Sequence, residues 1–205
     1  MREPEFRPPL ALVGKHLELV PLQTEHAPAL SEAGRDPKVW TYIRSGPATT
    51  LPAMAAQIGV LLERQRAGTD LCFTVRRLPG REPVGMTRFL RIDRESRGVE
   101  IGGTWYDPAY WRTPLNTEAK YLLFRHAFDV EHVHRVQLQT DARNVRSQRA
   151  IERLGAVREG RMREDMLMPD GAWRSSVLYS ILESEWPAAR RNLEEKLARP
   201  WPTPA

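Results

Sequence analysis

The sequence predicts one mixed α/β domain, in which a single sheet carries helices on both faces. Three observations predict it. The length of 205 residues suits one domain with a sizeable core. A content of 41% hydrophobic and 28% charged residues is the balance of a soluble globular chain. The patterns along the chain give one strand, two helices, three strands, a helix, a strand, a helix and a hairpin.

The first half of the chain contains the first six of these elements. Alternating apolar and polar residues over 16–22 indicate a strand, and 24–34 suit a short helix that ends at a glycine. Residues 52–67 predict an amphipathic helix, because apolar side chains recur there at helical spacing before Gly68. The three strands of a meander are expected at 70–78, 84–93 and 97–106.

The second half predicts a helix from about 115 to 130, a strand over 134–141 and a helix over 144–154. A long hairpin over 157–182 turns at an Asp-Gly pair, and a last short helix starts near 186. The apolar face of the first of these helices is expected to contain Ala119, Leu122, Leu123, His126, Ala127 and Val130.

Composition limits the classes of partner. The net charge of +5 and the pI near 9.7 favour an anionic partner. Cys72 is the only cysteine, so disulfides and thiolate metal clusters are excluded, and no His, Asp or Glu cluster has ligand spacing. We therefore expect no metal. With neither a signal peptide nor a run of ~20 apolar residues, the chain is expected in the cytoplasm, away from membranes.

Two strand-to-helix junctions carry the polar residues of interest. At the first, Thr113 is expected to cap a helix that has Pro114 at its first position. A helix start of this kind is a ready anion site, although an ordinary capped helix remains the alternative. The backbone N–H groups expected to point outward are those of Thr113, Leu115, Asn116 and Thr117.

The second junction places Asn144 at a strand exit and Ser147 one turn later. Two polar strand exits in succession are expected to flank one ligand cleft at the ends of neighbouring strands. Seven arginines lie between residues 143 and 163, which suits an elongated anionic ligand. A solvated basic face remains the other interpretation.

Three stretches together resemble the GNAT N-acyltransferases, and among them the branch of ribosomal-protein alanine and serine N-terminal acetyltransferases. They are "EIGGTWYDPAYWRTPLNTEAKYLLFRHAF", "RVQLQTDARNVRSQRAIERLGAVREG" and "PDGAWRSSVLYSIL". The resemblance implies a GNAT-type three-layer fold with a mixed, mostly antiparallel sheet and one splayed parallel strand pair. It covers residues 10–187, leaving 1–9 as a flexible tail and 188–205 as a C-terminal helix and proline-rich tail.

The resemblance also implies acetyl-coenzyme A as co-substrate. Asn144 and Ser147 match the residues that contact the pantetheine and thioester end, and Arg149 is expected at a phosphate. The backbone of Gly103, Thr104 and Trp105 is expected to pair with the pantetheine. The residues expected to wrap the pyrophosphate are Arg112, Thr113, Leu115, Asn116 and Thr117.

Two positions depart from the family pattern. The glycine-rich phosphate motif falls on Ala109, Arg112 and Pro114, so that no glycine is left and one N–H is lost. The Arg112 side chain is expected to compensate by binding phosphate. The tyrosine that many members use as the acid for the thiolate is replaced by Ile151.

Acyl transfer to an amine requires a base, an oxyanion donor and an acid. We expect Glu100 as the base, with a salt-bridged structural carboxylate as the alternative. A backbone N–H near Gly103 or Thr104 is the expected oxyanion donor. Ser147 is expected as the acid or as a hydrogen-bond donor to the thiolate, with water as the competitor.

The acceptor pocket is expected to involve Trp40, Tyr42 and Trp105, and rim packing is the alternative for each. The expected reaction is acetyl transfer to a primary amine by direct attack, with a peptide or protein N-terminus as acceptor. The alternatives are another acyl group such as succinyl, a small-molecule amine, or a non-catalytic basic module that binds RNA or the ribosome surface. The sequence leaves open whether the protein is a monomer or a homodimer.

Overall fold

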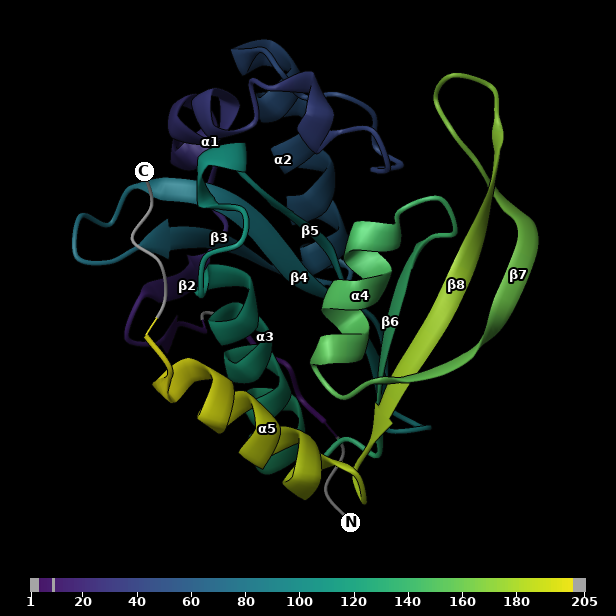
Figure 1. Cartoon of the computed structure of the whole chain (residues 1–205). Helices are drawn as coiled ribbons and strands as arrows, with labels where there is room; N and C mark the ends of the chain where they lie inside the picture. Colours follow the sequence, from purple (N-terminus) through teal and green to yellow (C-terminus); the bar gives the residue numbers. More distant parts are fainter. Residues whose placement is uncertain (1–3, 9, 201–205) are drawn as a thin grey trace.

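The computed structural model describes residues 4–8 and 10–200. In this part of the chain, eight strands form one sheet in the order β1-β2-β3-β4-β5-β6-β8-β7 (Figure 1). Every neighbouring pair is antiparallel except β5 with β6, so the predicted mixed sheet with one parallel pair is confirmed. The strands are β1 Leu12–Val13, β2 Leu17–Pro21, β3 Leu71–Arg77, β4 Pro83–Asp93, β5 Gly98–Tyr106, β6 Arg135–Asp141, β7 Val157–Leu167 and β8 Trp173–Leu182.

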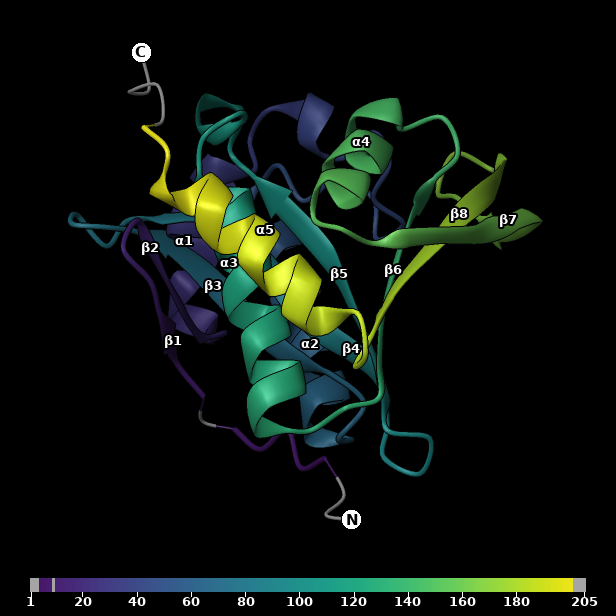
Figure 2. The same cartoon turned by 60° about the horizontal axis from the view of Figure 1, so that its bottom comes forward.

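Helices cover both faces of the sheet, as predicted. Figures 1 and 2 show α1 and α2 on one face, and α3, α4 and α5 on the other. In Figure 2, α5 lies along the outer side of α3, so that α3 is packed between the sheet and a second helix. The helices are α1 Ala27–Ala33, α2 Leu51–Arg66, α3 Leu115–Arg125, α4 Val145–Arg153 and α5 Trp186–Ala198.

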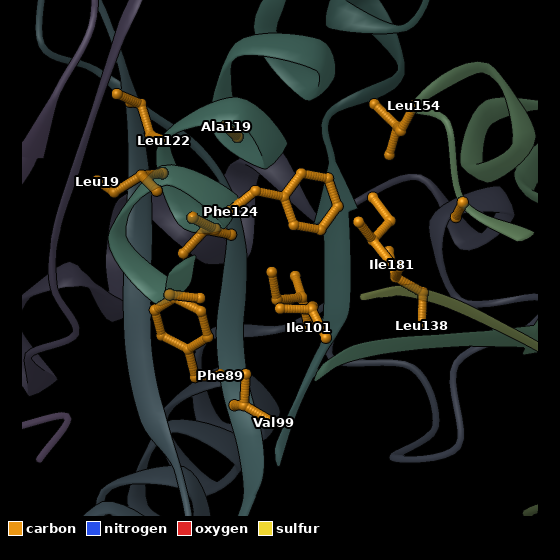
Figure 3. Packing of buried hydrophobic residues seen from close by; sticks show 14 of the residues in the cluster. Leu19, Phe89, Val99, Ile101, Ala119, Leu122, Phe124, Leu138, Leu154 and Ile181 are labelled. Carbon is orange, nitrogen blue, oxygen red and sulfur yellow. The ribbon is translucent and has the colours of Figure 1, made fainter. Parts of the chain in front are cut away.

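Each face of the sheet has its own apolar core. The core beneath α3 and α4 contains the residues labelled in Figure 3, which are Leu19, Phe89, Val99, Ile101, Ala119, Leu122, Phe124, Leu138, Leu154 and Ile181. The core beneath α1 and α2 includes Met54, Ile58, Met86 and Trp105. Because strand side chains alternate between faces, neighbouring residues of β4 and β5 belong to different cores.

Residues 4–8, the described part of the predicted N-terminal tail, lie against the domain. Phe6 is only 3% exposed, and its ring centre lies 4.8 Å from that of Phe89. The two-residue strand β1, which pairs with β2, has no counterpart among the predicted elements. The flanking prolines hide this segment in the sequence. Besides the Phe6 ring, the backbone of Glu5 holds it in place, since its N–H donates to the Glu131 carboxylate and its carbonyl accepts from Arg94.

The C-terminal end of the long central helix also differs from the prediction. The α-helical hydrogen bonding of α3 ends at Arg125, and a π-helical turn continues over His126–Val130. This wider turn shifts the helical phase, so Val130 is 60% exposed instead of lying on the apolar face. The last helix, expected near residue 186, begins there, so the predicted domain limit at 187 falls inside α5.

The central strand β5 is irregular at the point that matters for the site. Its pairing with β4 slips by one residue, and the extra residue lies at Gly103–Thr104, where Gly103 has a φ of +56°. Its parallel pairing with β6 covers only 98–100, after which the two strands diverge while β6 goes on pairing with β8. Beyond Glu100, the edge of β5 that faces β6 has no partner strand in the described chain.

Candidate active site

The loop before α3 carries a strained arginine. Arg112 has a φ of +65°, in the left-handed region that costs a non-glycine residue about 1–2 kcal/mol. Thr113 follows, and its hydroxyl donates to the carbonyl of Tyr110 at 2.7 Å and accepts a long contact of 3.5 Å from the N–H of Leu115. The backbone of the loop therefore has the conformation that suits glycine at the position where the family motif has one, although the residue is arginine.

The start of α3 differs slightly from the predicted cap. The helix begins at Leu115, with Pro114 rather than Thr113 as its N-cap residue, and the amide of Leu115 is not fully free. In the described chain, the N–H groups of Asn116 and Thr117 have no acceptor. The Thr117 side chain is fully buried and its hydroxyl also has no partner there. The helix start thus has unpaired N–H groups, as predicted, and they suit an anion.

The start of α4 is fixed by the end of β6. Asp141 is buried and receives two hydrogen bonds from the Arg143 guanidinium, at 3.1 and 2.8 Å, and one from its backbone N–H at 2.8 Å. Desolvation opposes ionisation of Asp141, but these hydrogen bonds outweigh it and lower the pKa of the carboxyl. Asn144 then caps α4, because its side-chain oxygen accepts from the N–H of Ser147 at 3.0 Å.

The two helix starts meet through a side chain that the sequence analysis did not select. The guanidinium of Arg146, in the first turn of α4, lies 3.7 Å from the ring centre of Trp111, which directly precedes the α3 loop. The pKa of Arg146 is lowered, first by desolvation and also by the nearby positive charge of Arg112. Both strand exits therefore face the same place, and two arginines accompany the unpaired N–H groups there. Arg149 is exposed on α4, where it stays a predicted phosphate ligand.

Glu100 lies at the last paired position of β5 with β6 and is only 3% exposed. One of its carboxylate oxygens, Oε2, is 3.1 Å from the Arg91 guanidinium and 3.4 Å from the side-chain nitrogen of Gln137. Burial raises the pKa of this carboxyl, although Arg91 and Arg88 work in the opposite direction. A carboxylate with a raised pKa is a better proton acceptor near neutral pH than an exposed one.

The three aromatic residues chosen for the acceptor pocket lie in different surroundings. Trp40 and Trp105 are buried, their rings are 5.2 Å apart, and the Trp40 indole N–H donates to the carbonyl of Gly34 at 2.7 Å. Tyr42 is only partly buried, and its carbonyl accepts from the Arg174 guanidinium at 3.2 Å. Of the three, Tyr42 is the one whose side chain remains partly accessible.

Comparison with known proteins shows the family of the chain. Residues 16–157 match the acetyltransferase (GNAT) domain family. The chain belongs to the GNAT acetyltransferase family. It is 27% identical over 158 residues to the [ribosomal protein uS5]-alanine N-acetyltransferase of Escherichia coli, covering 75% of this chain and 78% of that protein. It is 31% identical over 102 residues to the putative ribosomal N-acetyltransferase YdaF of Bacillus subtilis, covering 50% of this chain and 55% of that protein.

Solved structures of GNAT acetyltransferases share the fold. A putative acetyltransferase from T. thermophilus superposes with a TM-score of 0.85 at 40% identity, covering 93% of this chain and 98% of that chain. RimJ of Mycobacterium smegmatis, solved in complex with CoA-disulfide, has a TM-score of 0.81 at 20% identity, covering 95% of this chain and 98% of that chain. The predicted resemblance to the GNAT family is confirmed.

Two charged residues of α3 in this GNAT acetyltransferase were missed by the sequence analysis. Glu118 is buried, and its carboxylate accepts from the backbone N–H groups of Lys15, His16 and Leu17, which fixes the turn between β1 and β2. Lys120 is also buried, and its ammonium nitrogen lies 2.6 Å from the hydroxyl oxygen of Thr104. The burial of Glu118 and Lys120 is visible only from the tertiary contacts, because charged residues on a helix are normally exposed.

The structure of this GNAT acetyltransferase also shows the surroundings of Ile151 and Cys72. Ile151 is buried in the core beneath α4. Burial raises the pKa of the Cys72 thiol to about 12, so the residue behaves as a small apolar side chain. Among residues 4–8 and 10–200, no group of three His, Cys, Asp or Glu residues could hold a metal, and no helix is both long and apolar enough to cross a bilayer.

Proposed function

We propose that this protein is an N-acetyltransferase that moves an acetyl group from acetyl-coenzyme A to a primary amine by direct attack. Membership of the GNAT acetyltransferase family supports acetyl transfer, and use of coenzyme A is what the family implies. The observation that carries the proposal is the 3.7 Å contact between Arg146 and Trp111, because it brings the starts of α3 and α4 together beside the divergence of β5 from β6.

The residues present suit the phosphates of a nucleotide thioester. The free N–H groups of Asn116 and Thr117 and the guanidinium groups of Arg112 and Arg146 would hold the pyrophosphate. Leu115, Thr113 and Arg149 complete the proposed phosphate contacts.

The divergence of β5 from β6 suits the pantetheine arm. The edge of β5 over Gly103–Trp105 has no partner strand on its β6 side in the described chain, which leaves backbone groups for an amide-containing ligand. Asn144 uses its side-chain oxygen to cap α4, and its amide nitrogen, which has no partner among the described residues, would contact the pantetheine.

In the proposed reaction Glu100 takes a proton from the acceptor ammonium, directly or through a water, so that the neutral amine can attack. A backbone N–H at Gly103 or Thr104 would stabilise the oxyanion. The bulge at these residues supports the assignment, since it directs backbone groups away from regular pairing. Ser147 would donate a hydrogen bond to the departing sulfur.

A protein or peptide N-terminus is the proposed acceptor. The matched protein of Escherichia coli acts on an alanine of ribosomal protein uS5, and an α-amine with a pKa near ~8 loses its proton more easily than a lysine near ~10.4. Tyr42 is the proposed aromatic contact to the acceptor, with Trp40 and Trp105 shaping the site from beneath. A ribosomal acceptor would be met in the cytoplasm, which is the location that we propose for the protein.

The test is release of free coenzyme A thiol from a set of acyl donors in the presence of a panel of short peptides. The expected result is turnover of acetyl-coenzyme A with peptides that have a free α-amine, and none with the same peptides blocked at the N-terminus. Preference for succinyl-coenzyme A would mean that the transferred group is succinyl. Preference for blocked peptides with free lysines would mean that the acceptor is a lysine side chain. Salt-sensitive RNA binding without turnover of any donor would contradict the proposal and support a non-catalytic module.

A further inference from the structure

Lys120 is a lysine at a buried position where packing alone does not require a charged side chain. It projects from α3 towards β5, with apolar core residues Ala119 and Leu123 beside it in the helix, and it is 5% exposed. A buried ammonium without a counter-charge costs several kcal/mol in general, and a leucine or methionine would fill the same space without that cost. Buried lysines with strongly perturbed titration are more frequent at functional sites than elsewhere.

No carboxylate of the described residues neutralises Lys120. On its own helix, the Glu118 carboxylate binds the backbone of the turn before β2. Glu194 of α5 pairs with Arg190 and Tyr121. On β2, Glu18 is paired with Arg76.

The remaining ionisable groups of this layer are likewise not counter-charges. Tyr106 of β5 is buried, and desolvation raises the pKa of its hydroxyl, so it stays neutral. The π-helical turn contributes His126, which pairs with Glu131 at 3.3 Å. Burial lowers the pKa of Lys120 to about 7, so that both its charged and neutral forms are populated near neutral pH.

The single polar contact of Lys120 among the described residues leads to the site. Its nitrogen lies 2.6 Å from the Thr104 hydroxyl, which is 2.8 Å from the Thr87 hydroxyl of β4. Thr104 is only partly buried and follows Gly103, which is exposed although β5 is a central strand. The Thr104 hydroxyl therefore connects a buried amine to the accessible edge of β5 that diverges from β6.

We propose that Lys120 is the proton source for the departing sulfur and acts through the Thr104 hydroxyl. This inference rests on the proposed function, because it assumes a coenzyme A thioester along β5. It accounts for Ile151, which stands where many family members have an acidic tyrosine hydroxyl. Lys120 is thus a positioning and proton-supplying residue, while Thr104 is the group that touches the substrate.

The proton balance of the step is simple. As the bond between the acyl carbon and sulfur breaks, its electron pair goes to sulfur. The Thr104 hydroxyl gives its proton to that sulfur and takes one from the Lys120 ammonium, which becomes a neutral amine. The acceptor ammonium loses two protons to Glu100 or water, one before the amine attacks and one from the nitrogen of the tetrahedral intermediate. Sulfur takes up one proton, so one proton is released to solvent overall. Thr104 returns a proton to Lys120 from solvent when the products leave.

The test measures the pKa of the coenzyme A thiol while it is bound, from the ultraviolet absorbance of its thiolate. A free thiol has a pKa of about 8.5. If Lys120 supplies charge and a proton through Thr104, the bound thiol in the wild-type protein titrates about one unit or more lower. The variants Lys120→Met and Thr104→Val are expected to remove most of this shift and raise the value towards that of the free thiol, whereas Thr104→Ser retains the wild-type value.

Two further variants complete the design. Ser147→Ala serves as a comparison. If a hydrogen bond from Ser147 alone lowered the pKa of the bound thiol, this variant would lose the whole shift. If Lys120→Met does not fold, Thr104→Val carries the test by itself, since it replaces one small side chain by another of the same shape. Circular dichroism and coenzyme A affinity are measured for each variant.

The outcomes distinguish a failure of the proposed function from a failure of the proposed role of Lys120. Failure of the wild-type protein to bind coenzyme A would contradict the proposed function itself. Tight binding with the same thiol pKa in the wild-type protein, Lys120→Met and Thr104→Val would overturn the role of Lys120 and leave the proposed function intact. A shift that is lost only in Ser147→Ala would also overturn it.

Discussion

The Arg146 guanidinium lies 3.7 Å from the ring centre of Trp111, so one contact joins the first turn of α4 to the loop before α3. These segments are separated by β6 and all of α3 in the sequence. Their contact makes the two helix starts parts of one site, where desolvation lowers the pKa of Arg146 and the nearby charge of Arg112 adds to this effect. Two positive charges held near each other, neither of them paired with a carboxylate of residues 4–8 and 10–200, favour a polyanionic ligand.

Replacement of Arg146 by methionine is expected to weaken coenzyme A binding about tenfold, the loss typical of one charge-assisted hydrogen bond. Isothermal titration with coenzyme A measures it. Arg161→Met, on the exposed strand β7, removes the same charge away from the helix starts and serves as the control. Equal effects of the two substitutions would mean that only the overall charge of the protein matters.

Replacement of Arg112 by glycine separates backbone strain from side-chain charge. Because Arg112 has a φ of +65°, glycine is expected to raise the free energy of unfolding by up to about 1 kcal/mol in urea titrations. Arg112→Ala keeps the strain and also removes the charge. Both variants are expected to bind coenzyme A more weakly than the wild-type protein, and a glycine variant less stable than the alanine variant would contradict the account of the loop.

Replacement of Glu100 by glutamine is expected to lower turnover most at pH values below the pKa of the acceptor amine, where a proton has to be removed before attack. Burial raises the pKa of Glu100, so the wild-type rate should fall as the pH drops through that raised value and Glu100 becomes protonated. Initial rates across the acidic and neutral range, with coenzyme A affinity as the control, measure this. An unchanged pH profile in Glu100→Gln would remove Glu100 from the mechanism.

Replacement of Lys120 by methionine is expected to stabilise the protein at low and neutral pH. Burial lowers the pKa of Lys120 from 10.5 to about 7, so between these values the unfolded chain binds one proton more than the folded one. Wild-type stability therefore rises with pH across this window, and the cost of burying the charge is complete below about pH 7.

Urea unfolding of both proteins at about pH 6, 8 and 10 measures this difference. The excess stability of Lys120→Met should be largest at the lowest of these pH values and smallest at the highest. An excess that does not change with pH would mean that Lys120 titrates normally in the folded protein.

The fold could be predicted largely from the sequence, because hydrophobic periodicity and glycine stops are local signals. The two strand exits could be predicted for the same reason, since Asn144 and Ser147 belong to a helix start that is visible in the sequence. The burial of Lys120 could not be predicted, because it depends on β5 and β4 lying beneath α3. The contact of Arg146 with Trp111 depends on tertiary structure in the same way.

Unusual backbone conformations could not be predicted from the sequence either. The positive φ of Arg112 could not be predicted, because arginine gives no sign of left-handed backbone. The π-helical turn that exposes Val130 follows a continuous helical pattern, and Phe6 lies among prolines that suggest a loose tail. For Phe6 the deciding contact is with the ring of Phe89, which is distant in the sequence.

The central claim is that the starts of α3 and α4 together bind a coenzyme A thioester, and thermal or urea unfolding with and without acetyl-coenzyme A tests it most directly. At about 100 times the dissociation constant, bound ligand should raise the free energy of unfolding by about 2.7 kcal/mol. The account predicts such a rise in the wild-type protein and a smaller one in Arg146→Met at the same ligand concentration. No change at millimolar acetyl-coenzyme A would contradict it.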